Sequence, residues 1–232
     1  AAKKAYEESL SVEELASIRA EEAMYAAESN IEKVEAEVKA NAAFYEDFEG
    51  ETNKMGHRHK NNDTFTEEIV ADDDNKYAKV TVNSGAAASS MYGIDMDNGA
   101  TDHSKFAVEA STNYYIAFKY KTNSTSNVKL YRAATDLTNT TGANTSFAFT
   151  EASDWTQGLQ SIKTAATHSE YFFYFQLIRN TGVELYLDDV MVIKIADYEK
   201  LEKATTDYAK AVAAYEAAKK AYEESLSVEE LA

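Results

Sequence analysis

Apolar positions return every seven residues near the C-terminal end of the chain. The series consists of Leu201, Tyr208, Tyr215 and Tyr222, with Val212 at the interleaved position. An apolar repeat of this length is the a/d pattern of a helix that packs along a partner helix. Asp197 lies just before the pattern and is a suitable N-cap. We therefore predict a helix over about 197–224.

A second helix has a well-marked start near the N-terminus. Ser11 is followed three residues later by Glu14, which is the pattern of a capping box. Leu10 and Leu15 flank this box at the positions of a hydrophobic staple. A capping box marks the beginning of a helix, so the chain is expected to turn just before Ser11. The helix itself is predicted over about 12–43.

The apolar seam of this second helix is less regular than that of the first. Leu15 and Ile18 lie slightly out of phase with the seam residues, which are Met24, Ala27, Ile31, Val34 and Val38. At 1.5 Å per residue the two helices would be roughly 42 and 48 Å long. Because the lengths match, we expect them to pair antiparallel as a coiled-coil-like hairpin.

The middle of the chain has the apolar alternation of β-strands. Clusters of Asn, Gly, Asp, Ser and Thr separate the runs. Strands are predicted near 45–49, 65–70, 76–83, 105–110, 113–121, 127–132, 145–150, 157–164, 170–178 and 183–194. No helical pattern intervenes, so this part is predicted to be an antiparallel two-sheet sandwich. The fold class is therefore α+β.

The last predicted strand changes phase in its middle. Leu185 and Leu187 share one face, whereas Val190 and Val192 keep the apolar side with the opposite parity. One extra residue must be absorbed between the two pairs. We therefore predict a β-bulge at Asp188–Asp189.

Five segments of this β part form a recognisable set: Phe48-Glu49, 76–83, 113–121, Asp154-Trp155 and Leu185-Tyr186-Leu187-Asp188-Asp189-Val190. Together they resemble a known family, the carbohydrate-binding-module jelly rolls of bacterial xylan- and glucan-degrading enzymes. The opening Phe-Glu and the closing Leu-Asp-Asp-Val are the most specific marks. The resemblance covers about 44–195 and implies a jelly-roll fold for that part.

The resemblance also implies a structural calcium ion between the first and the last strand. The corresponding ligands here are Glu49 with Asp188 or Asp189. Ca²⁺ prefers several carboxylate and carbonyl oxygens, which suits this set. The alternative is that these acidic residues lie on the bulge without binding a metal ion.

Sugar sites in that family use exposed aromatic side chains on a sheet. Four tyrosines are candidates for such a platform, namely Tyr77, Tyr115, Tyr131 and Tyr171. The alternative is that these rings only pack on the sandwich. The single tryptophan, Trp155, is expected to be largely buried, in the place where the family packs one beneath a strand.

The same sixteen residues occur at both ends of the chain. Residues 217–232 repeat residues 1–16 without a difference, an offset of 216 residues. We interpret this as one period of a tandem array with the beginning of the next copy. The alternative is a pair of ends duplicated by design. The units are then 1–43 (end of one helix, turn and second helix), 44–195 (jelly roll) and 196–232 (first helix and start of the next repeat).

Composition excludes several classes of function. Of 232 residues, 40 are acidic and 23 are basic, which gives a net charge of −17. Such a chain is repelled by nucleic acid and by anionic lipid. There is no cysteine and no apolar run long enough to cross a membrane. The segment opens inside a helical pattern, so we expect no signal peptide in it. No catalytic motif is present, and an enzyme is not expected.

These observations predict a structural or adhesive repeat unit of a long extracellular fibre or cell-surface protein. The helices would form a spine and the jelly rolls would be displayed on it. The partners would then be adjacent repeats and neighbouring chains. The alternative is a carbohydrate-binding module that gains avidity for glycans from its tandem copies.

Overall fold

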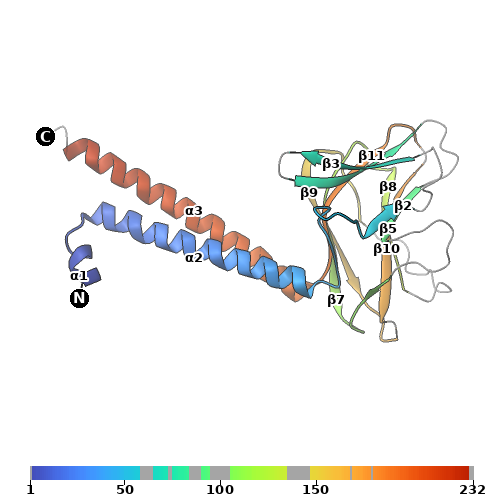
Figure 1. Ribbon diagram of the computed structural model, residues 1–232, viewed down its shortest axis with the longest axis horizontal. Coiled ribbons are helices and arrows are strands. Elements are labelled where there is room, and N and C mark those ends of the chain that lie inside the picture. The colour runs from blue at the N-terminus through green and yellow to red at the C-terminus, as the bar shows by residue number, and fades with distance from the viewer. Residues whose placement is uncertain are drawn as a thin grey trace. The chain divides into compact units, whose positions relative to one another are not determined.

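A computed structural model describes residues 2–57, 65–72, 75–83, 90–94, 105–134, 147–167, 169–178 and 180–229. The chain divides into two units, one of residues 1–41 with 196–232 and one of residues 42–195. The first unit is helical and the second is a β-sandwich (Figure 1). Among the described residues, no helix is long and apolar enough to cross a lipid bilayer.

Three helices make up the helical unit: α1 (Ala2–Glu7), α2 (Val12–Asn41) and α3 (Ile195–Glu229). The predicted start of α2 is confirmed, because the backbone N–H of Glu14 donates to Ser11 Oγ at 3.0 Å. Asp197 is not the N-cap of α3, since the helix already begins at Ile195. Strand β11 ends at Lys194 and leads directly into α3, so there is no loop to supply a cap. Asp197 instead pairs with Lys200 at 2.7 Å within the first turn.

Helices α2 and α3 lie side by side and run in opposite directions (Figure 1). The hydroxyl of Tyr215 on α3 donates to Glu21 Oε1 on α2 at 3.4 Å. The predicted seam positions are all half-buried or buried, namely Leu201, Tyr208, Val212, Tyr215, Tyr222, Ile31, Val34 and Val38. Coiled-coil packing along the whole length of the pair stays a prediction.

One sheet of the sandwich has six strands in the order β3-β4-β11-β7-β9, with β1 paired to β11. The strands are β1 (Phe44–Glu46), β3 (Phe65–Asp72), β4 (Asn75–Val82), β7 (Asn113–Thr122), β9 (Ala152–Lys163) and β11 (Glu184–Lys194). All these pairs are antiparallel. The first and last strands are therefore neighbours.

The other sheet has five strands in the order β2-β5-β10-β6, with β8 paired to β10. Its strands are β2 (Met55–His57), β5 (Ser90–Ile94), β6 (Phe106–Ala107), β8 (Val128–Ala134) and β10 (Glu170–Leu177). The sequence did not predict β2 and β5, because strands of three and five residues are too short to show a clear alternation of apolar and polar side chains.

The core lies between the two sheets and is rich in aromatic rings. Phe118 of β7 meets Phe175 of β10 edge to face, with ring centroids 5.0 Å apart. Phe147 and Phe149 pack against Phe118, at 5.2 and 5.9 Å. The segment around these two residues was predicted as a strand, but residues 147–150 do not form one. Their alternation reflects two rings that enter the core from an irregular segment.

Candidate functional site

The outward face of the six-stranded sheet carries one continuous row of aromatic and charged side chains. Lys79 of β4 lies opposite Tyr186 of β11, and Tyr186 lies opposite Lys121 of β7. Trp155 of β9 lies beside Lys121, whose Nζ is 4.5 Å from the ring centroid. These four side chains, Lys79, Tyr186, Lys121 and Trp155, are called the outer row below. Neighbouring strands are about 4.8 Å apart, so the outer row is roughly 14 Å long.

Tyr77 of β4 joins the two rings of the outer row. It meets Trp155 edge to face at 5.2 Å between centroids, with an interplanar angle of 77°. It meets Tyr186 at 6.1 Å and 53°. Lys121 Nζ lies 5.7 Å from the Tyr77 ring centroid. Edge-to-face contacts and ammonium–ring contacts each stabilise such a cluster, so the rings are held in one arrangement.

Glu184 supplies the negative charge of this surface. Its carboxylate lies 3.0 Å from Lys79 Nζ and accepts a hydrogen bond from the Tyr186 hydroxyl at 3.0 Å. The hydrogen bond to Glu184 raises the pKa of Lys79. Desolvation and then the same carboxylate raise the pKa of Tyr186. At neutral pH the surface therefore offers an ammonium, a carboxylate and a neutral phenol side by side.

Trp155 does not lie in the core, contrary to expectation. It is half-buried on the outward face of β9. The neighbouring Thr156 pairs with the core residue Tyr120, so Trp155 must point the other way. The register between β7 and β9 also shifts between Tyr120 and Thr122, a shift that is not visible in the sequence.

The four candidate tyrosines do not form one platform. Tyr77 and Tyr115 are both on the outward face of the six-stranded sheet, but Tyr115 pairs with Ile193, far along β7 from the outer row. Tyr171 belongs to the core and is 7% exposed. Tyr131 lies on β8 of the other sheet, and its side chain is outside the described residues. Of the three whose side chains the structure describes, Tyr77 alone belongs to the ring cluster.

A second polar site marks the junction of the first and last strands. The predicted bulge is confirmed, since the register of β11 against β7 shifts between Asp188 and Met191. Asp189 has a φ of 47°, in the left-handed region that Asp tolerates better than most residues. Its carboxylate lies 2.7 Å from Lys119 Nζ and accepts a hydrogen bond from the Tyr45 hydroxyl at 3.2 Å.

Asp188 is the buried acid of this junction, at 4% exposure. Its Oδ1 accepts the backbone N–H of Asp189 at 2.8 Å, and its Oδ2 accepts the side-chain amide of Asn75 at 3.3 Å. Burial raises the pKa of Asp188, and the charge of Asp189 adds to the effect. Burial also raises the pKa of Tyr45, with a contribution from Asp189.

Glu46 is a further buried acid at the junction, and the sequence analysis missed it. Its carboxylate accepts the backbone N–H of Phe48 at 2.8 Å and that of Lys54 at 2.5 Å. The signal was available, because Glu46 has the inward parity of Phe44 and Phe48. A charged residue at an inward position is normally held by hydrogen bonds. Glu46 therefore fixes the loop that follows β1.

Amide and lysine ammonium groups already contact the residues where calcium was expected, including Lys119 on Asp189 and amide N–H groups on Asp188. Glu49 Oε1 accepts the backbone N–H of Lys76 at 2.6 Å, and the carbonyl of Glu49 accepts Lys76 Nζ at 3.1 Å. The carbonyl of Tyr45 accepts Lys54 Nζ at 2.6 Å. Within the described ranges, no three His, Cys, Asp or Glu side chains gather closely enough to hold a metal ion. Ca²⁺ needs six to eight oxygens, so Glu49, Asp188 and Asp189 do not fit it as they are arranged.

No family model matches the sequence, and no curated protein matches it. Solved structures do resemble it. One is the CBM22-1 xylan-binding domain of Paenibacillus barcinonensis Xyn10C, with 13% identity and a TM-score of 0.46 over 66% of this chain and 94% of that domain.

Two further solved structures are similar. The CBM22-1–GH10 modules of Clostridium thermocellum Xyn10B, complexed with xylohexaose, show 14% identity and a TM-score of 0.45 over 67% of this chain and 29% of that one. A module of Cellvibrio mixtus lichenase 5A in complex with cellotriose shows 11% identity and a TM-score of 0.41 over 66% and 98%. All three contain a carbohydrate-binding module, the kind of domain that the sequence resembles.

Proposed function

We propose that the β-sandwich is a carbohydrate-binding module and that the outer row is its binding surface. The observation that carries this proposal is the row itself, in which Trp155 and Tyr186 alternate with Lys121 and Lys79. Sugars combine apolar C–H faces with hydroxyl groups, so they suit a surface of rings and charged hydrogen-bonding groups. A row of roughly 14 Å accommodates an oligosaccharide of a few units laid across the strands.

Trp155 is the only tryptophan, so its fluorescence reports directly on this surface. We expect xylo- or gluco-oligosaccharides at millimolar concentration to shift its emission, with affinities measured in parallel by calorimetry. Tyr186→Ala keeps the probe and removes a ring of the row. It should weaken binding at least tenfold.

Tyr115→Ala is the matched control, because it removes a tyrosine from the same outward face away from the outer row. It should leave the affinity within a factor of two. An equal loss in the two variants, or no binding heat with any oligosaccharide or with a glycan array, would overturn the proposal.

A second function is favoured by the repeated sixteen residues: a structural repeat unit of a long extracellular or surface protein. Identity at an offset of 216 residues is typical of tandem arrays. Tandem copies would also give a glycan-binding module avidity. The mass of the natural chain tests this. A protein with several periods supports it, and one with a single period refutes it.

A further inference from the structure

The repeated sixteen residues adopt two different conformations in one chain. In the first copy they form α1, a turn and the start of α2. The backbone N–H groups of Glu8, Ser9 and Leu10 close this turn at 3.0 to 3.4 Å. In the second copy, residues 217–229 continue α3 without a break. The helix predicted to end near 224 is therefore longer than expected.

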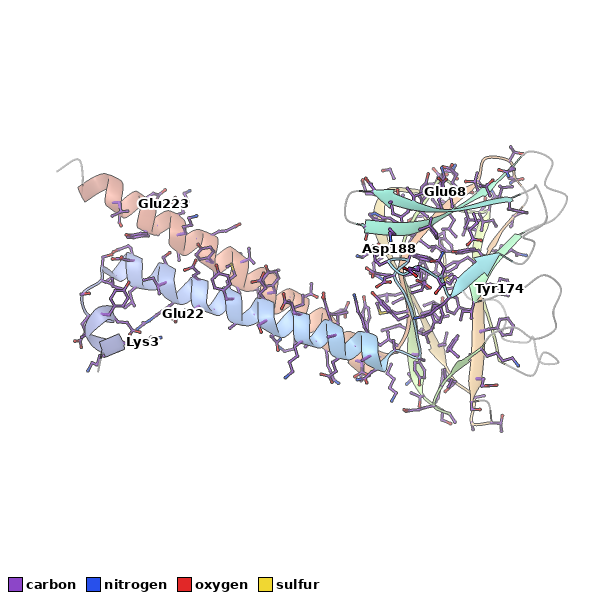
Figure 2. All side chains as sticks on the ribbon, in the orientation of Figure 1. Lys3, Glu22, Glu68, Tyr174, Asp188 and Glu223 are labelled. Atoms are coloured by element: carbon purple, nitrogen blue, oxygen red, sulfur yellow. The ribbon has the colours of Figure 1, made fainter. Side chains whose placement is uncertain are left out.

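In the first copy, α1 folds back against the beginning of α2. Lys3 and Glu22 are labelled in Figure 2, and Lys3 Nζ lies 3.4 Å from Glu22 Oε1. Arg19 Nη2 lies 3.2 Å from Glu7 Oε2. Arg19 and Glu22 are three residues apart and share one side of α2. We call this side the second face of α2; along its length it carries Leu15, Ile18, Arg19, Glu22, Ala26, Ser29, Lys33 and Ala36.

The second face explains why Leu15 and Ile18 were out of phase with the seam. Both are half-buried, although they point away from the side that faces α3. Spacings of three, four and seven residues put them on one side with Arg19 and Glu22. From Ala26 to Ala36 the second face is exposed. The α1 segment is too short to reach that part.

Each copy of the repeat makes a contact that the other lacks. Tyr222 in α3 is half-buried at a seam position, whereas its equivalent in α1, Tyr6, is 57% exposed. Conversely, Glu7 is half-buried and pairs with Arg19 of α2, whereas its equivalent Glu223 is exposed. The same sequence therefore contacts an α2 helix through its seam residues in one copy and through the flanking Glu7 position in the other.

We infer that the second face of α2 binds the α3 helix of another copy of this chain, namely the preceding repeat. The α1 segment is the last part of that helix and marks where it docks. Every α3 would then lie between two α2 helices, its own and that of the next repeat. This inference rests on the repeat arrangement proposed above.

The observed ion pairs fix the register of the proposed contact between the α3 helix of the preceding repeat and the second face. Glu7, the equivalent of Glu223, faces Arg19, and both helices repeat every seven residues. Two heptads further along, Ala209 of the preceding repeat comes to face Lys33. One heptad beyond the contact of Glu7 with Arg19, Glu216 of the preceding repeat comes to face Ala26. Small side chains at Ala26, Ser29 and Ala36 allow the helices to approach closely.

The test uses a chain that carries the 216-residue period twice. Because the natural sequence has no cysteine, two introduced thiols report on a single contact. Ala209→Cys in the first period and Lys33→Cys in the second should form an intramolecular disulfide under mild oxidation. Non-reducing electrophoresis and mass spectrometry of the linked peptide detect it.

The matched control replaces Lys33→Cys by Glu35→Cys, which lies on the opposite side of α2, and it should remain reduced. In a continuous helix through the repeat, positions 209 and 33 would be roughly 60 Å apart and could never link. Equal linkage in both variants, or none in the first, would overturn the docking. A natural chain with a single period would instead refute the repeat arrangement while leaving the linkage intact.

Discussion

Replacing Ser11 with alanine tests the turn that separates α1 from α2. The variant Ser11→Ala removes the hydroxyl that accepts the backbone N–H of Glu14 at 3.0 Å. Loss of such a cap costs about 1 kcal/mol of helix stability. That is about a fivefold increase in the opening equilibrium of the first turns of α2. Hydrogen exchange of a peptide covering residues 12–24, followed by mass spectrometry, measures it.

The chain provides its own control for this prediction. Ser227 has the same sequence neighbours as Ser11, but its backbone is inside α3. Alanine is the better interior helix residue by a few tenths of a kcal/mol, so Ser227→Ala should be neutral or slightly stabilising. Ser11→Asn, which keeps a good N-cap, should restore normal exchange. Equal effects of the two alanine variants would refute the assignment of a cap at Ser11 alone.

Three further outcomes are expected. EDTA should leave the melting temperature of the β-sandwich unchanged, because amide and ammonium donors already contact the carboxylates of Glu49, Asp188 and Asp189. A fall in melting temperature that calcium reverses and Glu49→Gln abolishes would instead show a metal site. Because the pKa of Asp188 is raised in the folded state, its contribution to stability is lost as the pH rises through that pKa. In urea titrations, Asp188→Asn should therefore increase the free energy of unfolding more at pH 7 than at about pH 4. An equal increase at both pH values would contradict this. Gly158→Ala should lower the free energy of unfolding by about 1–3 kcal/mol, because the added Cβ would lie 2.3 Å from the Phe118 ring. Gly50→Ala is the control and should lower it little, because its Cβ would have no contact below 3.5 Å.

The parts of the fold that follow from local pattern could be predicted from the sequence. The bulge could be predicted because the apolar residues change from odd to even positions between Leu187 and Val190. A strand with one buried face cannot shift its register by one residue without turning that face to solvent, so an extra residue must be inserted. The start of α2 was visible because a capping box is a local signal. The strands of the six-stranded sheet alternate clearly enough to be found, whereas the short strands β2 and β5 do not.

The candidate site depended on contacts that no local pattern contains. Trp155 faces outward because its neighbour Thr156 pairs with the core residue Tyr120, and register between distant strands is set by the whole sheet. Its cluster with Tyr77 joins β4 to β9, strands that are not adjacent in the sheet. The contacts of the junction lysines could not be predicted either, because Lys54 and Lys76 reach the residues of β1 and its loop only in the folded protein.

The repeated sixteen residues mark the limit of prediction from local sequence. The two copies are identical, yet one turns at Ser9–Ser11 and the other remains helical. The capping box and the staple are present in both, so they permit the turn without imposing it. The first copy is followed by thirty residues of α2, which offer α1 a surface to fold back on. In the second copy, residues 217–229 continue α3, which forms more backbone hydrogen bonds than a turn would. Helix packing therefore decides between two locally acceptable conformations.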